Sequence, residues 1–387
     1  MRNAVIVDAV RTPLGRRNGM LKDWHPADLA AEALRALAER NSLDPALVDD
    51  VVMGCVSQVG EQTFNIARNA VLGAGWPESV PGVTIDRQCG SSQQAVHFAA
   101  QGVMAGAYDV AVAAGVESMT RVPMGSSYSQ GPGKPFGEQM SARYNHSLVP
   151  QGLSAEMIAE KWGMSREEID GYGFDSHMRA ARATDEGRFD NQLVPIEVKA
   201  EDGSVVTMTR DEGIRPSTTR EALAGLRPAF KEDGVVTAGN SSQITDGAAA
   251  MLIMSEDEAR RLGYTPKARF VSFSLAGTDP VLMLTGPIPA TEKALAKAGL
   301  TIGDIDLFEV NEAFACVIGA WLRETRADWE KTNVNGGAIA IGHPLGASGA
   351  RLMTTLVHEL ERTGGRYGLQ TMCEGGGLAN GTIIEML

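Results

Sequence analysis

Hydrophobic and polar positions along the chain alternate between helical spacing and short apolar runs. Residues 34–39 carry Leu and Ala at helical spacing, and the apolar run 51–53 follows after an acidic turn. Residues 292–297 and 307–310 repeat the same order of elements. Helices that alternate with short strands in each half predict an α/β fold with mainly parallel sheets covered by helices.

The two halves of the chain repeat each other in a single register. Leu43 and Leu300, which follow the two predicted helices, lie 257 positions apart. The same offset carries Ser91 onto Ser348, and both residues lie in a glycine-containing turn that leads into a predicted helix region. Landmarks that share one register indicate an internal duplication of one α/β unit.

Between the two halves the composition and the periodicity of the sequence change. Residues 118–247 hold Gly/Pro/Ser-rich stretches, polar connections and a charged helical pattern near residues 166–182. Long irregular insertions on a rigid scaffold commonly form binding elements. We therefore expect an N-terminal half at 1–117 completed by 248–268, an inserted loop domain at 118–247, and a C-terminal half at 269–387.

Charge and cysteine content restrict the partners and the compartment. The 387 residues carry a formal net charge of −13, with 43% hydrophobic and 21% charged residues. An acidic chain disfavours nucleic acid and anionic membranes as partners, and no apolar run reaches membrane-spanning length. The four cysteines follow no regular spacing, which favours a reducing cytoplasm over a disulfide framework. We expect a cytoplasmic protein.

Cys89 is the first candidate for chemistry. The β-branched run Val83-Thr84-Ile85 leads towards Cys89, and an apolar helical pattern begins at Ala95. A thiol at a helix N-terminus faces unpaired backbone N–H groups, which favour the thiolate and make it a nucleophile for acyl transfer. The alternative is a buried cysteine that acts as a small hydrophobic residue.

His343 lies in a second glycine-rich turn, in which Gly346 is the pseudo-symmetric mate of Cys89. If both turns lie at the same end of adjoining sheets, His343 can take a proton from Cys89. The glycines permit close approach of another group, and Pro344 stiffens the turn. The alternative is an ordinary polar loop residue.

Cys373 follows a predicted strand and precedes three glycines, Gly375 to Gly377. Consecutive glycines can present backbone N–H groups as an oxyanion pocket. A second cysteine can be an acid/base group, a disulfide or redox partner of Cys89, or a metal ligand. Because the sequence has no Cys-x-x-Cys or paired-His spacing, a zinc site is disfavoured.

Asn311 also follows a predicted strand, in the segment Asn311-Glu312-Ala313-Phe314-Ala315. Its amide can hold a water molecule or donate to a developing negative charge, and Glu312 can orient a neighbour. The alternative is an ordinary helix N-cap.

These blocks resemble the signature sequences of the thiolase family. The resemblance implies a thiolase fold, in which two pseudo-symmetric halves form a five-layer αβαβα core and the inserted loop domain helps to bind coenzyme A. The internal duplication supports this expectation independently. The matching blocks run in order over nearly the whole chain, at residues 86–91, 114–119, 237–242, 311–315, 335–346 and 373–377.

The resemblance also implies an activity and a set of roles. Thiolases cleave a 3-ketoacyl-CoA with free CoA, or run the reverse Claisen condensation, through an acyl-cysteine. Cys89 would be the nucleophile, His343 its activating base and Cys373 the second acid/base group. His343 with a water held by Asn311 would form one oxyanion site, and the N–H groups of Cys89 and Gly375 the other.

Coenzyme A is expected as a substrate, and the resemblance requires no metal or redox cofactor. Ser242 matches a serine that contacts the pantetheine, and Leu226 and Arg227 lie where the adenine pocket is expected. Family members commonly form dimers that pair into tetramers, so a homodimer or homotetramer is expected.

The chain departs from the family pattern at two places. Glu374 replaces a residue that is more often small or apolar, and it puts a carboxyl group beside Cys373. Residues 149–152 lack the His-x-Met-Gly often seen in short-chain biosynthetic members. This absence favours a degradative thiolase with a bulkier acyl group, such as a ring-bearing one, over an acetoacetyl-CoA thiolase.

Two other classes of function remain open. A condensing enzyme of the ketoacyl-synthase type shares the fold, but it uses two histidines and a Gly-His-Thr loop where this chain has Gly342-His343-Pro344. A non-enzymatic acyl-CoA or lipid-carrier module would have no need of Cys89, Asn311, His343 and Cys373 together.

Overall fold

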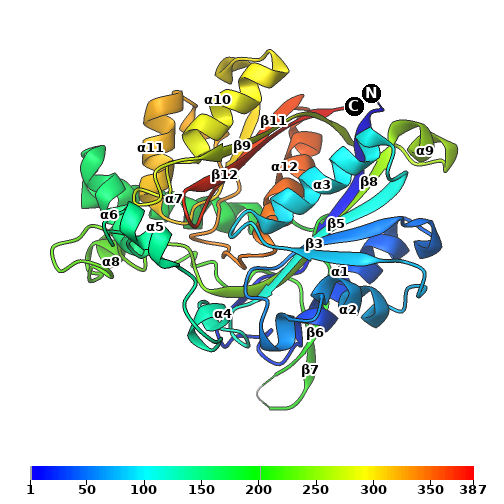
Figure 1. The fold of residues 1–387 in the computed structure, drawn as a ribbon, viewed down its shortest axis with the longest axis horizontal. Helices are drawn as coiled ribbons and strands as arrows, with labels where there is room; N and C mark the ends of the chain where they lie inside the picture. The colour runs from blue at the N-terminus through cyan, green and yellow to red at the C-terminus, as the bar shows by residue number, and fades with distance from the viewer. Residues whose placement is uncertain (1, 201) are drawn as a thin grey trace.

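A ten-stranded mixed sheet forms the centre of the computed structural model, which describes residues 2–200 and 202–387 (Figure 1). Nine strands follow the order β10-β11-β12-β9-β1-β8-β5-β3-β4, and β2 pairs with β8. The two halves join where β1 pairs with β9. These strands are β1 (Ala4–Arg11), β2 (Gly15–Arg16), β3 (Asp50–Gly54), β4 (Gly82–Ile85), β5 (Val110–Ser118), β8 (Thr245–Ser255), β9 (Ala268–Gly277), β10 (Leu307–Val310), β11 (Tyr367–Glu374) and β12 (Leu378–Met386).

The two halves of this sheet have the same strand order. From the join outwards, one half runs β1-β8-β5-β3 and the other runs β9-β12-β11-β10. The strands β5 and β11 begin at Val110 and Tyr367, and helices α3 (Ser91–Ala105) and α12 (Ser348–Thr363) begin at Ser91 and Ser348. Each pair of starting residues is 257 positions apart, so the structure confirms the duplicated register.

Three layers of helices enclose the two halves of the sheet (Figure 1). The helices α1 and α2 pack on one outer face, α3 and α12 lie between the halves, and α10 and α11 pack on the other outer face. This arrangement is the five-layer αβαβα core that the sequence predicts. The outer helices are α1 (Pro26–Arg40), α2 (Ile66–Gly73), α10 (Pro287–Ala298) and α11 (Ala315–Thr325), and the short α9 (Glu256–Arg261) follows β8.

The expectation of mainly parallel strands is wrong for the inner part of the sheet. Only β3–β4, β3–β5 and β10–β11 pair in parallel, and the other pairs are antiparallel. The cause is visible at β11 and β12, which are joined by the three glycines 375–377. So short a connection permits antiparallel pairing and leaves no length for a crossover helix.

The insertion leaves the sheet after β5 and returns with β8. It packs on both halves: Ile196 and Met208 lie in one hydrophobic cluster with the first half, and Ile158 and Val236 lie in another with Phe314 and Cys373 of the second half. Because the insertion shares its core with the scaffold, the predicted bounds of the three units stay a prediction. Within the described residues, no helix combines the length and the apolar character needed to span a membrane. The elements of the insertion are α4 (Ser126–Ser129), α5 (Glu138–Arg143), α6 (Gln151–Lys161), α7 (Arg166–Asp185), β6 (Ile196–Lys199), β7 (Val205–Met208) and α8 (Arg220–Ala224).

Candidate active site

A tight turn presents Cys89 at the start of α3. Gln88 adopts a left-handed conformation with φ of 48°, and Gly90 is the N-cap of the helix. The backbone N–H of Ser91 donates to the carbonyl of Gln88 at 3.0 Å, and the hydroxyl of Ser91 accepts from the backbone N–H of Arg87 at 2.9 Å. Cys89 is 4% exposed, so the turn holds its thiol in a nearly closed site.

The surroundings of Cys89 combine a desolvated thiol with several hydrogen-bond donors. Burial is the main cause that raises its pKa to about 12, and the effect of a charge on Glu374 is the second. The backbone N–H groups of Gly375 and Cys89 and the side chain of Gln151 act in the opposite direction. Donors at this position favour negative charge on the sulfur or on a substrate oxygen.

Gln151 is a residue of this site that the sequence reasoning missed. It is the first residue of α6, in the insertion, and its Nε2 lies 3.4 Å from where a Cβ on Gly375 would stand. Only the departure of residues 149–152 from the family pattern gave a signal there. That departure predicts a bulkier acyl group, and it does not indicate a contact with the thiol.

His343 is held as one tautomer. The hydroxyl of Ser348 lies 2.5 Å from Nδ1 of His343 and donates to the carbonyl of Pro344 at 2.8 Å. Because that hydroxyl proton is used on Pro344, the oxygen of Ser348 accepts from Nδ1–H of the imidazole. The lone pair of Nε2 therefore points towards the amide of Asn311, whose Nδ2 is 3.3 Å away.

The protonation state of His343 suits a base. The side chain is 3% exposed, and burial lowers the pKa to about 3, with the positive charge of Arg351 adding to the effect. The imidazole is therefore neutral at physiological pH and can accept a proton.

Cys373 stands at the end of β11 and is fully buried. Burial raises the pKa of its thiol well above the usual value, and Cys89, Glu374 and Cys316 follow as further causes. Cys89 also shares a hydrophobic cluster with Leu345 of the His343 turn and with Met372, the residue before Cys373. The structure thus brings together the three segments that the sequence identified separately. All four cysteines are free thiols.

Asn311 does not act as a helix cap. The N-cap of α11 is Phe314, so the alternative interpretation of Asn311 is wrong. Its backbone N–H donates to the carbonyl of Thr371 at 3.1 Å, which fixes the residue beside β11. Its buried Oδ1 has no partner among the described residues, and such an atom is suited to hold a water molecule.

The predicted coenzyme A contacts divide into two groups. Ser242 is half-buried, and its backbone N–H donates to the carbonyl of Ala313 at 2.9 Å, which places it against the Asn311 segment. Leu226 is 37% exposed and Arg227 is exposed, and both lie on the surface of the insertion after α8.

Glu117 holds two backbone segments of the site together through hydrogen bonds. The sequence does not predict this role. Its buried carboxylate accepts from the backbone N–H groups of Val56, Ser57 and Gly346 at 2.9, 3.0 and 2.9 Å. It also accepts from the side-chain amide of Gln62 at 2.7 Å. The residue ties the His343 turn to the segment that follows β3, and the block 114–119 was its only signal in the sequence.

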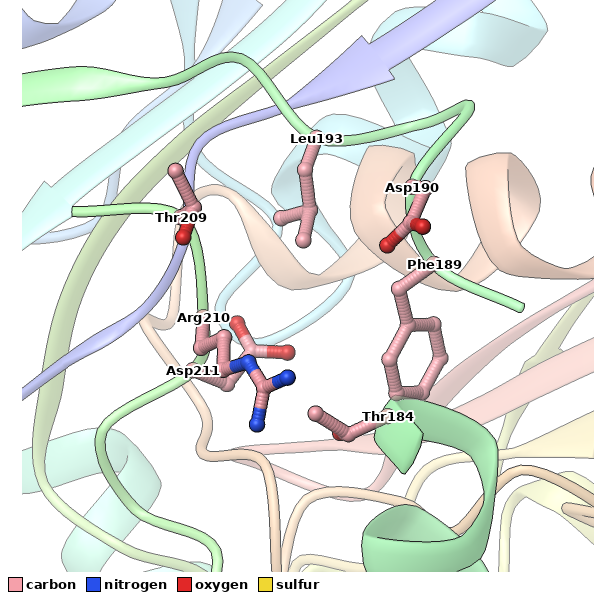
Figure 2. A pocket seen from close by; sticks show the side chains of 7 residues that line it. All are labelled: Thr184, Phe189, Asp190, Leu193, Thr209, Arg210 and Asp211. Atoms are coloured by element: carbon pink, nitrogen blue, oxygen red, sulfur yellow. The ribbon is translucent and has the colours of Figure 1, made fainter. Parts of the chain in front are cut away.

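A cavity of about 200 Å³ lies elsewhere, at the end of α7 (Figure 2). Within its wall, Asp211 accepts two hydrogen bonds from Arg11 at 2.7 and 2.9 Å and one from the backbone N–H of Leu14. That carboxylate is thus engaged in structure. None of the predicted site residues lines the cavity, whose walls are Thr184, Phe189, Asp190, Leu193, Thr209, Arg210 and Asp211. Among the described residues, no group of three or more His, Cys, Asp or Glu side chains can hold a metal ion.

Family models cover almost the whole chain. The model of the thiolase N-terminal domain matches residues 4–257, and that of the thiolase C-terminal domain matches residues 264–386. The chain belongs to the thiolase family. Thiolases are acyltransferases, and the family agrees with the two-half architecture of the sheet.

Individual thiolases are similar over their full length. A steroid 3-ketoacyl-CoA thiolase of Mycobacterium tuberculosis is 52% identical, over 100% of this chain and 95% of its own. A 3-ketoacyl-CoA thiolase of Aliivibrio fischeri is 46% identical over 100% of both chains. Human mitochondrial 3-ketoacyl-CoA thiolase superposes with a TM-score of 0.92 at 42% identity, covering 100% of this chain and 99% of its own. The acetyl-CoA acetyltransferase of Bacillus anthracis gives the same TM-score and coverage at 41% identity.

Proposed function

We propose that this thiolase cleaves 3-ketoacyl-CoA with free CoA, giving acetyl-CoA and an acyl-CoA shortened by two carbons. The observation that carries the proposal is that Cys89 lies against Cys373 and against the turn that holds a neutral His343. Relatives that are named 3-ketoacyl-CoA thiolases support the degradative direction.

The first half-reaction acylates the enzyme. Nε2 of His343 takes the proton of Cys89, and the thiolate attacks the C3 ketone of the substrate. The bond between C2 and C3 then breaks, which leaves the acyl group on Cys89 and an acetyl-CoA enolate. The thiol of Cys373 gives its proton to the enolate carbon, and acetyl-CoA departs.

The second half-reaction releases the acyl group. The Cys373 thiolate takes the proton of free CoA, whose sulfur attacks the acyl-Cys89 thioester. Cys89 leaves as a thiolate and recovers its proton from His343. Donors from Gly375 and Gln151 and a water held by Asn311 stabilise the oxyanions, and each such donor contributes about 3–4 kcal/mol.

For the acyl group we propose a bulky, ring-bearing substrate. The relative at 52% identity is named for steroid substrates, and this chain has Gln151 where short-chain biosynthetic members often carry other residues. An acetoacetyl-CoA substrate is the second candidate, because the similar structure at 41% identity is an acetyl-CoA acetyltransferase.

The deciding experiment is thiolysis by the purified chain on 3-ketoacyl-CoA thioesters of increasing size, with Cys89→Ser as the matched variant. We expect cleavage that depends on Cys89, an acyl-Cys89 adduct by mass spectrometry, and faster turnover of ring-bearing thioesters than of acetoacetyl-CoA. Absence of turnover and of adduct on every thioester would reject the proposal in favour of a carrier module. Condensation without thiolysis would favour a ketoacyl-synthase type of enzyme.

Coenzyme A would bind between Ser242 and the insertion surface at Leu226 and Arg227. Its phosphates need local cations because the chain as a whole carries a charge of −13. We expect Arg227→Ala to raise the KM for CoA with little change in kcat.

The chain would work as a homodimer or homotetramer in the cytoplasm. The strand β4 ends the sheet, and exposed apolar side chains surround it: Phe64 (88%), Leu72 (45%), Val83 (41%) and Phe98 (45%). An edge strand with apolar neighbours favours pairing with a second copy. Sedimentation of the purified chain tests this, and a monomer at micromolar concentration would reject it.

A further inference from the structure

Glu374 is a buried carboxyl group whose oxygens have no hydrogen-bond donor in the described part of the chain. It is the last residue of β11, it follows Cys373, and its side chain is fully enclosed. Among the described residues, neither of its oxygens has a hydrogen-bond partner. An unpaired buried carboxylate is among the most costly groups in a protein interior.

The carboxyl group lies directly against the N-terminus of the nucleophile helix. A Cβ atom built on Gly90 would stand 1.9 Å from Oε1 of Glu374 and 2.8 Å from Oδ1 of Asn380. Gly90 has φ of −85°, which most residues adopt, so a glycine is needed here for space and not for conformation. The two oxygens converge on one point beside the N-cap of α3.

Asn380 directs an acceptor towards this point. Its Nδ2 donates to Oε1 of Gln94 at 3.1 Å and lies 3.2 Å from Nδ1 of His97. Nε2 of His97 is in turn 2.7 Å from the hydroxyl of Thr382. The amide is oriented by this buried network, and its Oδ1 has no partner among the described residues.

Two acceptor oxygens thus converge beside Gly90 with no side-chain donor between them among the described residues. The amide of Asn380 has no further hydrogen to give in this orientation, whereas a protonated carboxyl group carries one donor. We propose that Glu374 is a neutral carboxylic acid that donates to Oδ1 of Asn380 and thereby keeps negative charge away from the Cys89 thiol. This positioning role rests on the proposed function, because it acts through Cys89.

The electrostatic surroundings agree with a neutral acid. Burial raises the pKa of Glu374 well above its usual range, and the attraction of Arg87 and of the nearby backbone N–H of Asn380 offsets this only in part. A charge on Glu374 would raise the pKa values of Cys89 and Cys373 and oppose the thiolates. The titratable and charged groups that face it are Arg87 and Asp86 before α3, Cys89 in the turn and Cys373 on β11, and His97 of α3 lies beyond Asn380.

Infrared spectroscopy of the full-length chain tests the protonation state directly. The difference spectrum of wild type minus Glu374→Gln at pH 7 is expected to show the C=O stretch of a protonated carboxylic acid. In wild type alone, that band is expected to fade only above neutral pH. An ionised-carboxylate band in the difference spectrum, or no protonated band in wild type, overturns the proposal whether or not the variant folds.

The rate at which iodoacetamide alkylates Cys89, followed by peptide mass spectrometry, tests the consequence. At pH 7, Glu374→Gln is expected to match wild type within about twofold, and to exceed it increasingly at alkaline pH, by about tenfold for each pKa unit removed. A large gain already at pH 7 would show an ionised Glu374 and overturn the proposal. Asp86→Asn, which removes a nearby carboxyl group on the exposed turn, is the matched control and is expected to retain the protonated band. Neither readout needs turnover, so failure here is distinguishable from failure of the proposed function.

Discussion

The hydroxyl of Ser348 lies 2.5 Å from Nδ1 of His343, and this contact determines which nitrogen of the imidazole carries the proton. Because the same hydroxyl donates to the carbonyl of Pro344, it accepts from the imidazole and leaves Nε2 unprotonated. The base of the proposed reaction is therefore set by a residue that touches no reacting atom.

Replacing Ser348 is expected to lower kcat while substrate binding persists. In Ser348→Ala the imidazole loses its acceptor at Nδ1 and can take the wrong tautomer, so kcat should fall about tenfold to a hundredfold. The KM for the 3-ketoacyl-CoA should change little. Steady-state kinetics of the purified variant measure both values. Ser348→Thr, which keeps the hydroxyl, is the matched variant and should recover most of the activity; an equal loss in both variants would assign the effect to packing.

Glu117 is expected to matter for stability as well as for activity. In Glu117→Gln one acceptor oxygen becomes an NH2 group that faces backbone N–H donors, which should lower the free energy of unfolding by about 2–4 kcal/mol. Urea unfolding measures this loss. Glu61→Gln is the matched control: Glu61 pairs with Arg121 near the surface, and its replacement should cost less than about 1 kcal/mol. Equal losses in the two variants would contradict the bracing role.

Gln151 is expected to activate the Cys89 thiol. Gln151→Met removes a donor to the sulfur, so the pKa of Cys89 should rise and its alkylation at neutral pH should slow about tenfold. Iodoacetamide labelling over a range of pH measures the shift. Gln130→Met, at an exposed position after α4, should leave the labelling rate unchanged. A Gln151→Met chain that labels at the wild-type rate would remove Gln151 from the site.

Glu309 is expected to make stability depend on pH. This residue of β10 is 2% exposed, and burial raises its pKa from 4.5 to about 8. The pKa of Glu309 is higher in the folded chain than in the unfolded chain. Its contribution to the free energy of unfolding is therefore complete below pH 4.5 and is lost as pH rises towards about 8. The unfolding free energy of wild type should therefore fall relative to Glu309→Gln across this window, by up to about 1.4 kcal/mol per pH unit. A constant difference between the two chains would contradict the burial argument.

The sequence predicts the scaffold well because the scaffold repeats. The offset between Ser91 and Ser348 locates two helix starts to the residue, and periodicity identifies the strands around them. Strand direction was predicted less well, since the choice between parallel and antiparallel pairing depends on connection lengths that apolar patterns do not fix.

For the site, sequence motifs identify residues that carry chemistry themselves but not those that support them. Cys89, His343, Cys373 and Asn311 each stand in a glycine-rich or strand-end context that local reasoning can read. Gln151 reaches the thiol from the insertion, and Glu117 binds backbone groups from two distant segments. Such contacts arise only when segments far apart in the chain pack together, so no local sequence pattern predicts them.

The duplicated register also bears on how such a site can arise. Ser91 and Ser348 occupy the same place in the two copies, and each hydroxyl donates to a carbonyl of its own turn, that of Gln88 or of Pro344. In the first copy this bond steadies the nucleophile; in the second, the same side chain also orients the base. Where the first copy has Cys89, the second has Gly346. The two copies have therefore specialised in opposite directions, and neither half could be replaced by a second copy of the other without losing the reaction.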